Sequence, residues 1–222
     1  RKVLAILRAS MDGALPPDLR SDAWIITQNA RRLLAALRGF FDRFDRPAGA
    51  NRCRRIETRV EHGVPEAAVG LTAIDGVGAA RGETLTAAGL TDPGAIRAAG
   101  LAGLVEAGLS EEVATTVLEG ARDLPRIEID WGAFPTSVPV GENVLREVTV
   151  RATGAAARLG IRVTVNGVEM NRTVRYVENA TTVPVGVFGA DDDELTYAVE
   201  VTTPEEPLAP VVETRTVAVE GR

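Results

Sequence analysis

A chain of 222 residues with 45% hydrophobic content is long enough to bury one to three cores, which excludes a wholly disordered protein. No run approaches the roughly 18 apolar residues of a membrane span, and the one cysteine, Cys53, cannot close an internal disulfide. We therefore expect a soluble, cytoplasmic protein. The net charge of -6 is unevenly distributed: residues 1–64 carry 13 basic and 7 acidic side chains, whereas residues 65–125 and 126–222 each carry an excess of six acids. A basic block in an acidic chain favours a polyanionic partner.

Residues 1–64 predict a helical bundle. "KVLAILRASMDG" reads as a first helix, and residues 22–46 read as a long second helix capped by Ser21 or Asp22. Its apolar side chains fall within an arc of about 120°, the width of a core-facing stripe. They are Ile26, Ala30, Leu33, Leu34, Leu37, Phe40, Phe41 and Phe44, and the opposite arc carries Arg31, Arg32, Arg38, Arg43 and Arg46.

After Pro47 and Gly49, "ANRCRRIETRVEHG" predicts a third helix that ends at Gly63. Its inward positions are Cys53, Ile56 and Val60, and its arginines at 52, 54, 55 and 59 are expected to point mostly outward.

Residues 65–125 predict a compact helix-hairpin-helix module. Short alanine-rich helices are expected near 65–72, 79–88, 92–98, 100–107 and 111–122, the last one capped by Ser110. The turn "IDGVG" has an apolar residue, two glycines one residue apart and then a helix, and a helix rather than a strand precedes it. That context argues against a dinucleotide-binding loop.

The "IDGVG" turn is the best candidate site in the sequence. Backbone amides of Gly76, Val77 and Gly78 at a helix N-terminus would favour a phosphate oxygen without reading any base, and Arg81 would add a direct charge contact. Asp75 and Glu83 place negative charge beside the same position. Phosphate contact and a purely structural turn therefore both stay open.

From residue 126 the hydrophobic period becomes two. Seven segments alternate apolar and polar residues and are separated by turn-forming residues: "RIEIDW", "LREVTVRAT", "GIRVTVNG", "RTVRYVE", "TTVPVGVFG", "LTYAVEVT" and "ETRTVAVE". This number of strands in residues 126–222 is typical of an immunoglobulin or fibronectin type III-like β-sandwich. The predicted fold class is therefore multidomain α and β: an all-α bundle and helix-hairpin-helix module followed by an all-β sandwich.

Catalytic constellations are absent from the sequence. There is no phosphate-binding loop motif, and the only lysine is Lys2. The single histidine, His62, and the single cysteine lie on expected structural helices, which excludes the usual zinc and nucleophile-base arrangements. The acidic run at 189–196 lacks calcium-loop spacing and reads as an acidic loop tip. We expect no catalytic residue, no metal and no cofactor in this chain.

Three stretches in order carry a resemblance to a known family: "SDAWIITQNARRLLAAL", "RRIETRVEHGVPEAAVGLTAIDGVGAARGETLTAAGL" and "GLSEEVATTVLEGAR". They resemble the C-terminal helical region of the Ski-two-like superfamily-two helicases, most of all the archaeal fork-repair DNA helicases. The joint from Arg59 to Glu66, followed by a helix-hairpin-helix, is the specific part. With the sandwich added, the chain resembles the Sec-sixty-three-like unit of that superfamily.

The segments 1–64, 65–125 and 126–222 are the expected domains, and the resemblance implies that the first contains a ratchet-like helix that contacts single-stranded nucleic acid. On that helix the expected contacts are Arg31, Arg32 and Arg38, which join the contacts expected at Gly76, Val77, Gly78 and Arg81, with DNA favoured. Because the chain begins at Arg1 rather than Met, we expect it to be a piece of a longer protein whose motor domains would bind ATP and magnesium. The alternative is a protein-interaction scaffold of the helicase, with partners bound through the sandwich and no nucleic-acid contact. No membrane partner is expected.

Overall fold

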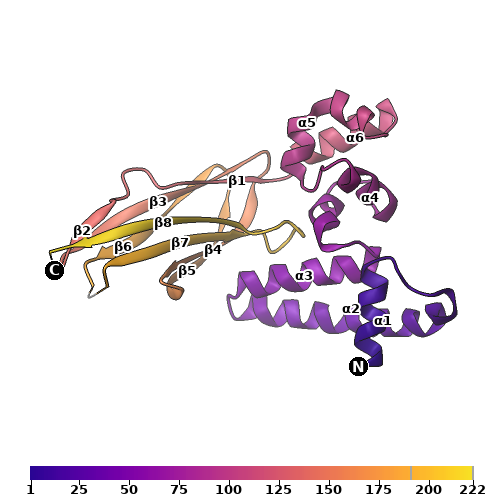
Figure 1. The fold of residues 1–222 in the computed structure, drawn as a ribbon, viewed down its shortest axis with the longest axis horizontal. Helices are drawn as coiled ribbons and strands as arrows, with labels where there is room; N and C mark the ends of the chain where they lie inside the picture. Colours follow the sequence, from indigo (N-terminus) through magenta and orange to yellow (C-terminus); the bar gives the residue numbers. More distant parts are fainter. Residues whose placement is uncertain (191, 222) are drawn as a thin grey trace. The chain divides into compact units, whose positions relative to one another are not determined.

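The structure, a computed structural model, describes residues 1–190 and 192–221 and divides the chain into two compact units. Unit 1 comprises Arg1–Leu124 and Thr203–Ala209, and unit 2 comprises Pro125–Thr202 and Pro210–Arg222. The described part of unit 1 forms helices and that of unit 2 forms strands (Figure 1). The expected combination of α and β domains is therefore confirmed at this level.

The helices of unit 1 follow the predicted order. Its elements are α1 (Lys2–Met11), η1 (Pro17–Leu19), α2 (Arg20–Arg43), α3 (Pro47–His62), η2 (Glu66–Ala73), α4 (Ala79–Ala87), α5 (Pro93–Glu106) and α6 (Glu111–Arg122). The long helix α2 begins two residues before the predicted start, without a side-chain cap. Pro47 supplies the first residue of α3, where its missing N–H costs no hydrogen bond, and Gly63 caps the helix as predicted.

The predicted core-facing stripe of α2 is only half buried, which corrects the prediction. Ile26, Ala30, Leu34 and Phe41 are half-buried, and Phe41 lies against Gly49 of α3. The other edge of the stripe is in solvent: Leu33, Leu37, Phe40 and Phe44 are 48% to 66% exposed. Among the described elements, α2 contacts mainly α3 and, to a smaller extent, α1. These two helices cover only part of the 120° stripe.

The second half of unit 1 has its own apolar core. Buried side chains from η2, α4, α5 and α6 meet there, with Leu71, Ile74, Leu85, Ile96, Leu104 and Val117 at its centre. The first predicted helix of this region is a 3-10 segment, η2. The two helices predicted at 92–98 and 100–107 form α5 with a kink at Gly100. Ser110 precedes α6 as predicted, but its side chain makes no capping hydrogen bond.

Unit 2 is built from two sheets that enclose one core. Its strands are β1 (Arg126–Asp130), β2 (Ser137–Pro139), β3 (Asn143–Thr153), β4 (Ala157–Val165), β5 (Val168–Val177), β6 (Ala180–Phe188), β7 (Glu194–Thr202) and β8 (Val211–Glu220). The sheet orders are β1-β3-β6 and β2-β8-β7-β4-β5. Val150 on one sheet and Val199 on the other belong to the same buried cluster, as alternating inward positions require.

All seven predicted strand segments are strands in the structure, and β2 is an additional one. It escaped prediction because three residues, one of them Pro139, are too few to show a period of two. It pairs in parallel with β8. The predicted hairpin turn after β4 is present, with Asn166 at φ 48° and Gly167 at φ 79°, the pair of left-handed residues that a tight primed turn requires.

Candidate nucleic-acid interface

The "IDGVG" turn leads directly into α4. Gly76 has a φ of +79°, a left-handed conformation that a residue with a side chain adopts only under strain. Gly78 is the residue before the helix, and its carbonyl accepts the first helical bond, from the Gly82 amide at 2.8 Å. The amides of Ala79, Ala80 and Arg81 therefore have no acceptor within the helix. A Cβ built on Gly78 meets no atom within 4 Å, so this helix start is open.

Val77 has a different role from the predicted one. Its side chain is 4% exposed and belongs to the core shared by η2, α4, α5 and α6. Its amide donates to the Ile74 carbonyl at 3.0 Å, so it is not an outward donor as predicted. The three residues thus have different roles. Gly76 reverses the chain direction, Val77 packs into the core, and Gly78 precedes the first residue of α4 and leaves it accessible.

Arg81 is the third residue of α4, and its guanidinium is engaged locally. Nη1 donates to the Gly76 carbonyl at 2.5 Å, and the side chain is exposed. Asp75 and Glu83 are exposed as well, so the predicted competition between one cation and two carboxylates remains in the folded protein. A ligand phosphate would have to displace the Gly76 carbonyl or share the guanidinium with it.

The arginines of α2 separate into two kinds. Arg31 donates to Glu61 at 2.6 Å and Arg38 approaches Glu57 at 3.3 Å, so both reach carboxylates on α3. These side chains are 34% and 25% exposed. Arg32 is exposed and makes no ion pair within the described residues. Of the predicted contacts on this helix, Arg32 is therefore the one whose charge faces solvent without a carboxylate partner.

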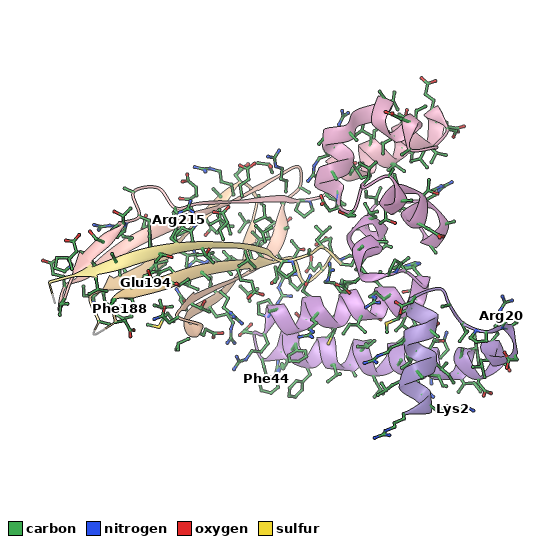
Figure 2. All side chains as sticks on the ribbon, viewed as in Figure 1. Lys2, Arg20, Phe44, Phe188, Glu194 and Arg215 are labelled. Carbon is green, nitrogen blue, oxygen red and sulfur yellow. The ribbon has the colours of Figure 1, made fainter. Side chains whose placement is uncertain are left out.

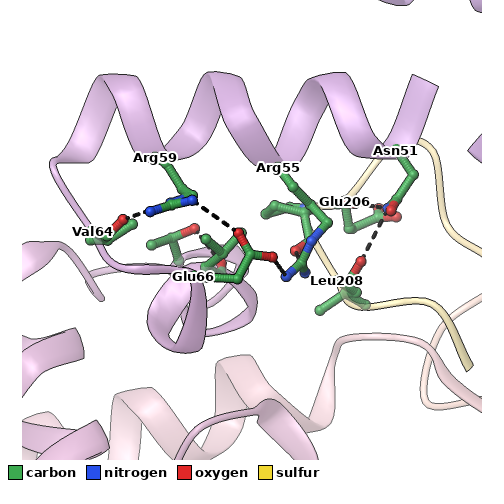
Figure 3. Close-up of polar contacts among 10 residues, drawn as sticks. Asn51, Arg55, Arg59, Val64, Glu66, Glu206 and Leu208 are labelled. Atoms are coloured by element: carbon green, nitrogen blue, oxygen red, sulfur yellow. Dashed lines mark hydrogen bonds and ion pairs between the residues drawn. The ribbon is translucent and has the colours of Figure 1, made fainter. Parts of the chain in front are cut away.

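The arginines of α3 do not point mostly outward, as was predicted. The Arg55 and Arg59 side chains are only 13% and 19% exposed, and both bind the Glu66 carboxylate, at 2.5 and 3.3 Å (Figure 3). Arg59 also reaches Asp12 at 3.0 Å. Burial raises the pKa of Glu66, but the Arg55 hydrogen bond and the nearby guanidinium charges outweigh it and hold the pKa below its ordinary value. Part of the positive charge of residues 1–64 is thus neutralised by ion pairs within the protein.

A polar anchor that the sequence did not reveal lies at the start of α3. Asn51 is 1% exposed, and its Nδ2 donates to the carbonyls of Thr203, Leu208 and Glu206 at 3.0, 3.1 and 3.2 Å (Figure 3). The neighbouring arginines add two bonds to the same segment: Arg54 Nε donates to the Pro204 carbonyl and Arg55 Nη1 to the Pro207 carbonyl. The segment 203–209, which connects β7 and β8, therefore belongs to unit 1.

Burial shifts the pKa values of two charged residues in this anchor. It lowers the pKa of Arg54, and together with the adjacent Glu205 carboxylate it raises the pKa of Glu206. One asparagine within an arginine-rich helix carries no sequence signal of such a role. The proline-rich composition of "TTPEEPLAP" marks a loop but not its binding site.

Cys53 is buried, and burial raises the pKa of its thiol, against the opposing charge of Arg38. His62 is exposed in the last turn of α3. Within residues 1–190 and 192–221 no three histidine, cysteine or acidic side chains are grouped as a metal site would need. The acidic run at 189–196 includes Asp191, which lies outside the described residues. Across the same residues, no helix combines the length and the hydropathy of a membrane span.

No family model matches the chain. No curated protein matches it either. Two solved structures illustrate the likenesses found. A CARDB domain from Pyrococcus furiosus, in complex with di-metal ions, is 17% identical, covers 44% of this chain and 94% of its own, and has a TM-score of 0.38. A beta-glucosidase from Listeria innocua in complex with glucose is 18% identical, covers 44% of this chain and 16% of its own, and has a TM-score of 0.31. Similarity this low does not identify a function.

Proposed function

We propose that the chain is a non-catalytic accessory region of an ATP-dependent superfamily-two helicase, and that it holds the backbone of single-stranded nucleic acid, DNA by preference. ATP and magnesium would act in motor domains of the same polypeptide, outside this chain. The proposal includes a fibronectin type III-like identity for unit 2, which the three-strand and five-strand sheets with their shared core support.

The open start of α4 carries the proposal. Three consecutive amides without helical acceptors meet the positive end of the helix dipole there, next to a glycine with free space above its Cα. Such a helix start stabilises a phosphate oxygen without base specificity. Arg81 and Arg32 supply charge for non-specific backbone contact, which is the mode that single-strand-binding surfaces use.

The revised contact set is smaller than the predicted one. Gly78, Arg81 and Arg32 keep a role in binding, and Gly76 positions the turn. Since Arg31 and Arg38 are paired with α3 carboxylates, they act in this proposal mainly by fixing α2 to α3. Binding by so few cations should be weak, and its salt dependence should be shallow, because the slope of log affinity against log salt is only about -0.7 for each neutralised phosphate.

Gly78→Val tests the contact without disturbing the fold. The added side chain starts in open space, and the φ of Gly78 is -96°, which any residue adopts. We expect a labelled single-stranded oligonucleotide to bind the variant at least about tenfold more weakly in fluorescence anisotropy, because the branched side chain blocks approach to the amides. Gly39→Ala is the matched control, since its Cβ also meets nothing within 4 Å, on α2. Equal affinity of the wild type and Gly78→Val would reject the phosphate contact.

A protein-binding role is the second candidate, and one observation favours it. The exposed apolar edge of α2 offers a surface that nucleic-acid backbone would not recognise.

A further inference from the structure

The exposed edge of α2 has the pattern of a helix-pairing seam. The α2 seam consists of Leu33, Leu37, Phe40 and Phe44, at spacings of four, three and four residues. At 100° per residue these side chains fall within an arc of about 60°. Each is 48% to 66% exposed, and the rings of Phe40 and Phe44 contact each other with centroids 4.5 Å apart. Phe44 lies on the side of α2 away from α3 in Figure 2.

The α2 seam is suited to one kind of occupant, a second helix. Spacings of four and three residues are those of the a and d positions of a heptad, whose side chains insert between four residues of a facing helix. The seam spans about 16 Å of helix axis, or three turns. It belongs to none of the buried clusters of the described residues. A contiguous row of large apolar side chains in solvent marks an interaction site more often than isolated ones do.

Charge beside the seam selects the chemistry of that helix. Arg43 occupies the position that flanks the seam in a heptad, and Arg32 lies near it on the same flank. Both are exposed and make no ion pair among the described residues. The opposite flank is occupied by the packing of α2 on α3.

A second copy of the chain fits this surface poorly. Two copies paired through the same seam would bring Arg32 and Arg43 from each copy to one interface, where their like charges repel. Like charges along a helix-pairing seam disfavour association and direct partner choice. A helix with acidic residues on its flank meets the same surface with complementary charge.

We propose that the α2 seam binds an amphipathic helix of another protein, with apolar residues at its a and d positions and Asp or Glu on the flank that faces Arg43 and Arg32. This site does not use the α4 helix start, and it shares only Arg32 with the proposed nucleic-acid contact. The apolar side chains supply most of the affinity and the arginines supply selectivity.

Two stapled helical peptides of about three heptads test the site, since unconstrained helices of this length are marginal in water. Both carry leucine at a and d, and they differ only in having glutamate or lysine at the flanking positions. In anisotropy titrations against the full chain, we expect the glutamate peptide to bind about tenfold tighter than the lysine peptide at low salt. Phe40→Ala should weaken it at least about tenfold, as expected for a central aromatic anchor.

The charge-reversal variant Arg43→Glu should invert the preference between the peptides, while Arg122→Glu, an exposed arginine on α6, should leave it unchanged. Leu101→Ala, an exposed leucine on α5, should not alter peptide affinity. Absence of peptide binding, equal affinity for both peptides, or unchanged affinity in Phe40→Ala would overturn the proposal. So would a dimer of the chain alone, seen in light scattering and abolished by Phe40→Asp, because a second copy would then occupy the seam.

Discussion

Replacing Asn51 by alanine should release the segment 203–209 from α3. The Asn51 side-chain amide has two hydrogens, and it shares them among three carbonyl oxygens within 3.2 Å. Each hydrogen bond contributes about 0.5–1.5 kcal/mol net, so we expect a loss of about 1–3 kcal/mol. The loss cannot exceed the free energy with which the segment docks, because the undocked carbonyls would bind water instead.

Hydrogen exchange is the appropriate assay for the Asn51→Ala variant. A chain with two compact units need not unfold in one step, so a single unfolding midpoint would not isolate the anchor. Amides in 203–209 and in the first turns of α3 should exchange about 5- to 150-fold faster, the equivalent of 1–3 kcal/mol. Amides in the core of unit 2 should keep their rates.

Asn29→Ala is the matched control for Asn51→Ala. Asn29 lies exposed on α2, and surface substitutions of this kind change stability by within about 0.5 kcal/mol. Equal amide exchange rates in residues 203–209 of Asn51→Ala and Asn29→Ala would contradict the anchoring role of Asn51.

Three further predictions concern the same bundle. Because burial and then the Glu205 carboxylate raise the pKa of Glu206, docking of 203–209 should strengthen as the pH falls and weaken as it rises from about 4.3 through the raised pKa. In Glu206→Gln, exchange of this segment, corrected for intrinsic rates, should lose that dependence; a retained dependence would point to another group. A double-mutant cycle on Arg38 and Glu57 should give a coupling of about 0.5–1 kcal/mol in urea unfolding, and a value of zero would contradict a structural role for the pair. Native Cys53 should react with a thiol reagent far more slowly than in denaturant, and equal rates would contradict its burial.

Local sequence patterns predicted the positions of the helices and strands well. They predicted less well which face of each helix is buried. The seven alternating segments, the Asn166-Gly167 turn and the Gly63 cap follow from interactions between residues close in sequence. The orientation of α2 does not, because it depends on which neighbour covers its apolar arc. Its amphipathic pattern predicts one buried stripe, yet part of that stripe is in solvent and Arg31 instead faces a carboxylate on α3.

The candidate site shows the same division. The Gly76 reversal and the helix start at Gly78 were predictable, since a left-handed glycine before an alanine-rich helix is a local signal. The hydrogen bond from the Val77 amide to the Ile74 carbonyl was not predicted, because the sequence does not give the geometry of the turn. The contact between Asn51 and Thr203 joins residues 152 positions apart, and no periodicity in one sequence reports such a pair.

The salt dependence of oligonucleotide binding tests the proposed function most directly. For single strands the slope of log affinity against log salt is about -0.7 for each phosphate that a cation neutralises. If Arg32 and Arg81 each neutralise one phosphate, the wild-type chain should bind, and replacing both by alanine should make its slope shallower by about 1.4. Binding with the same slope in both proteins, or no binding by the wild type at low salt, would contradict a nucleic-acid role for this chain.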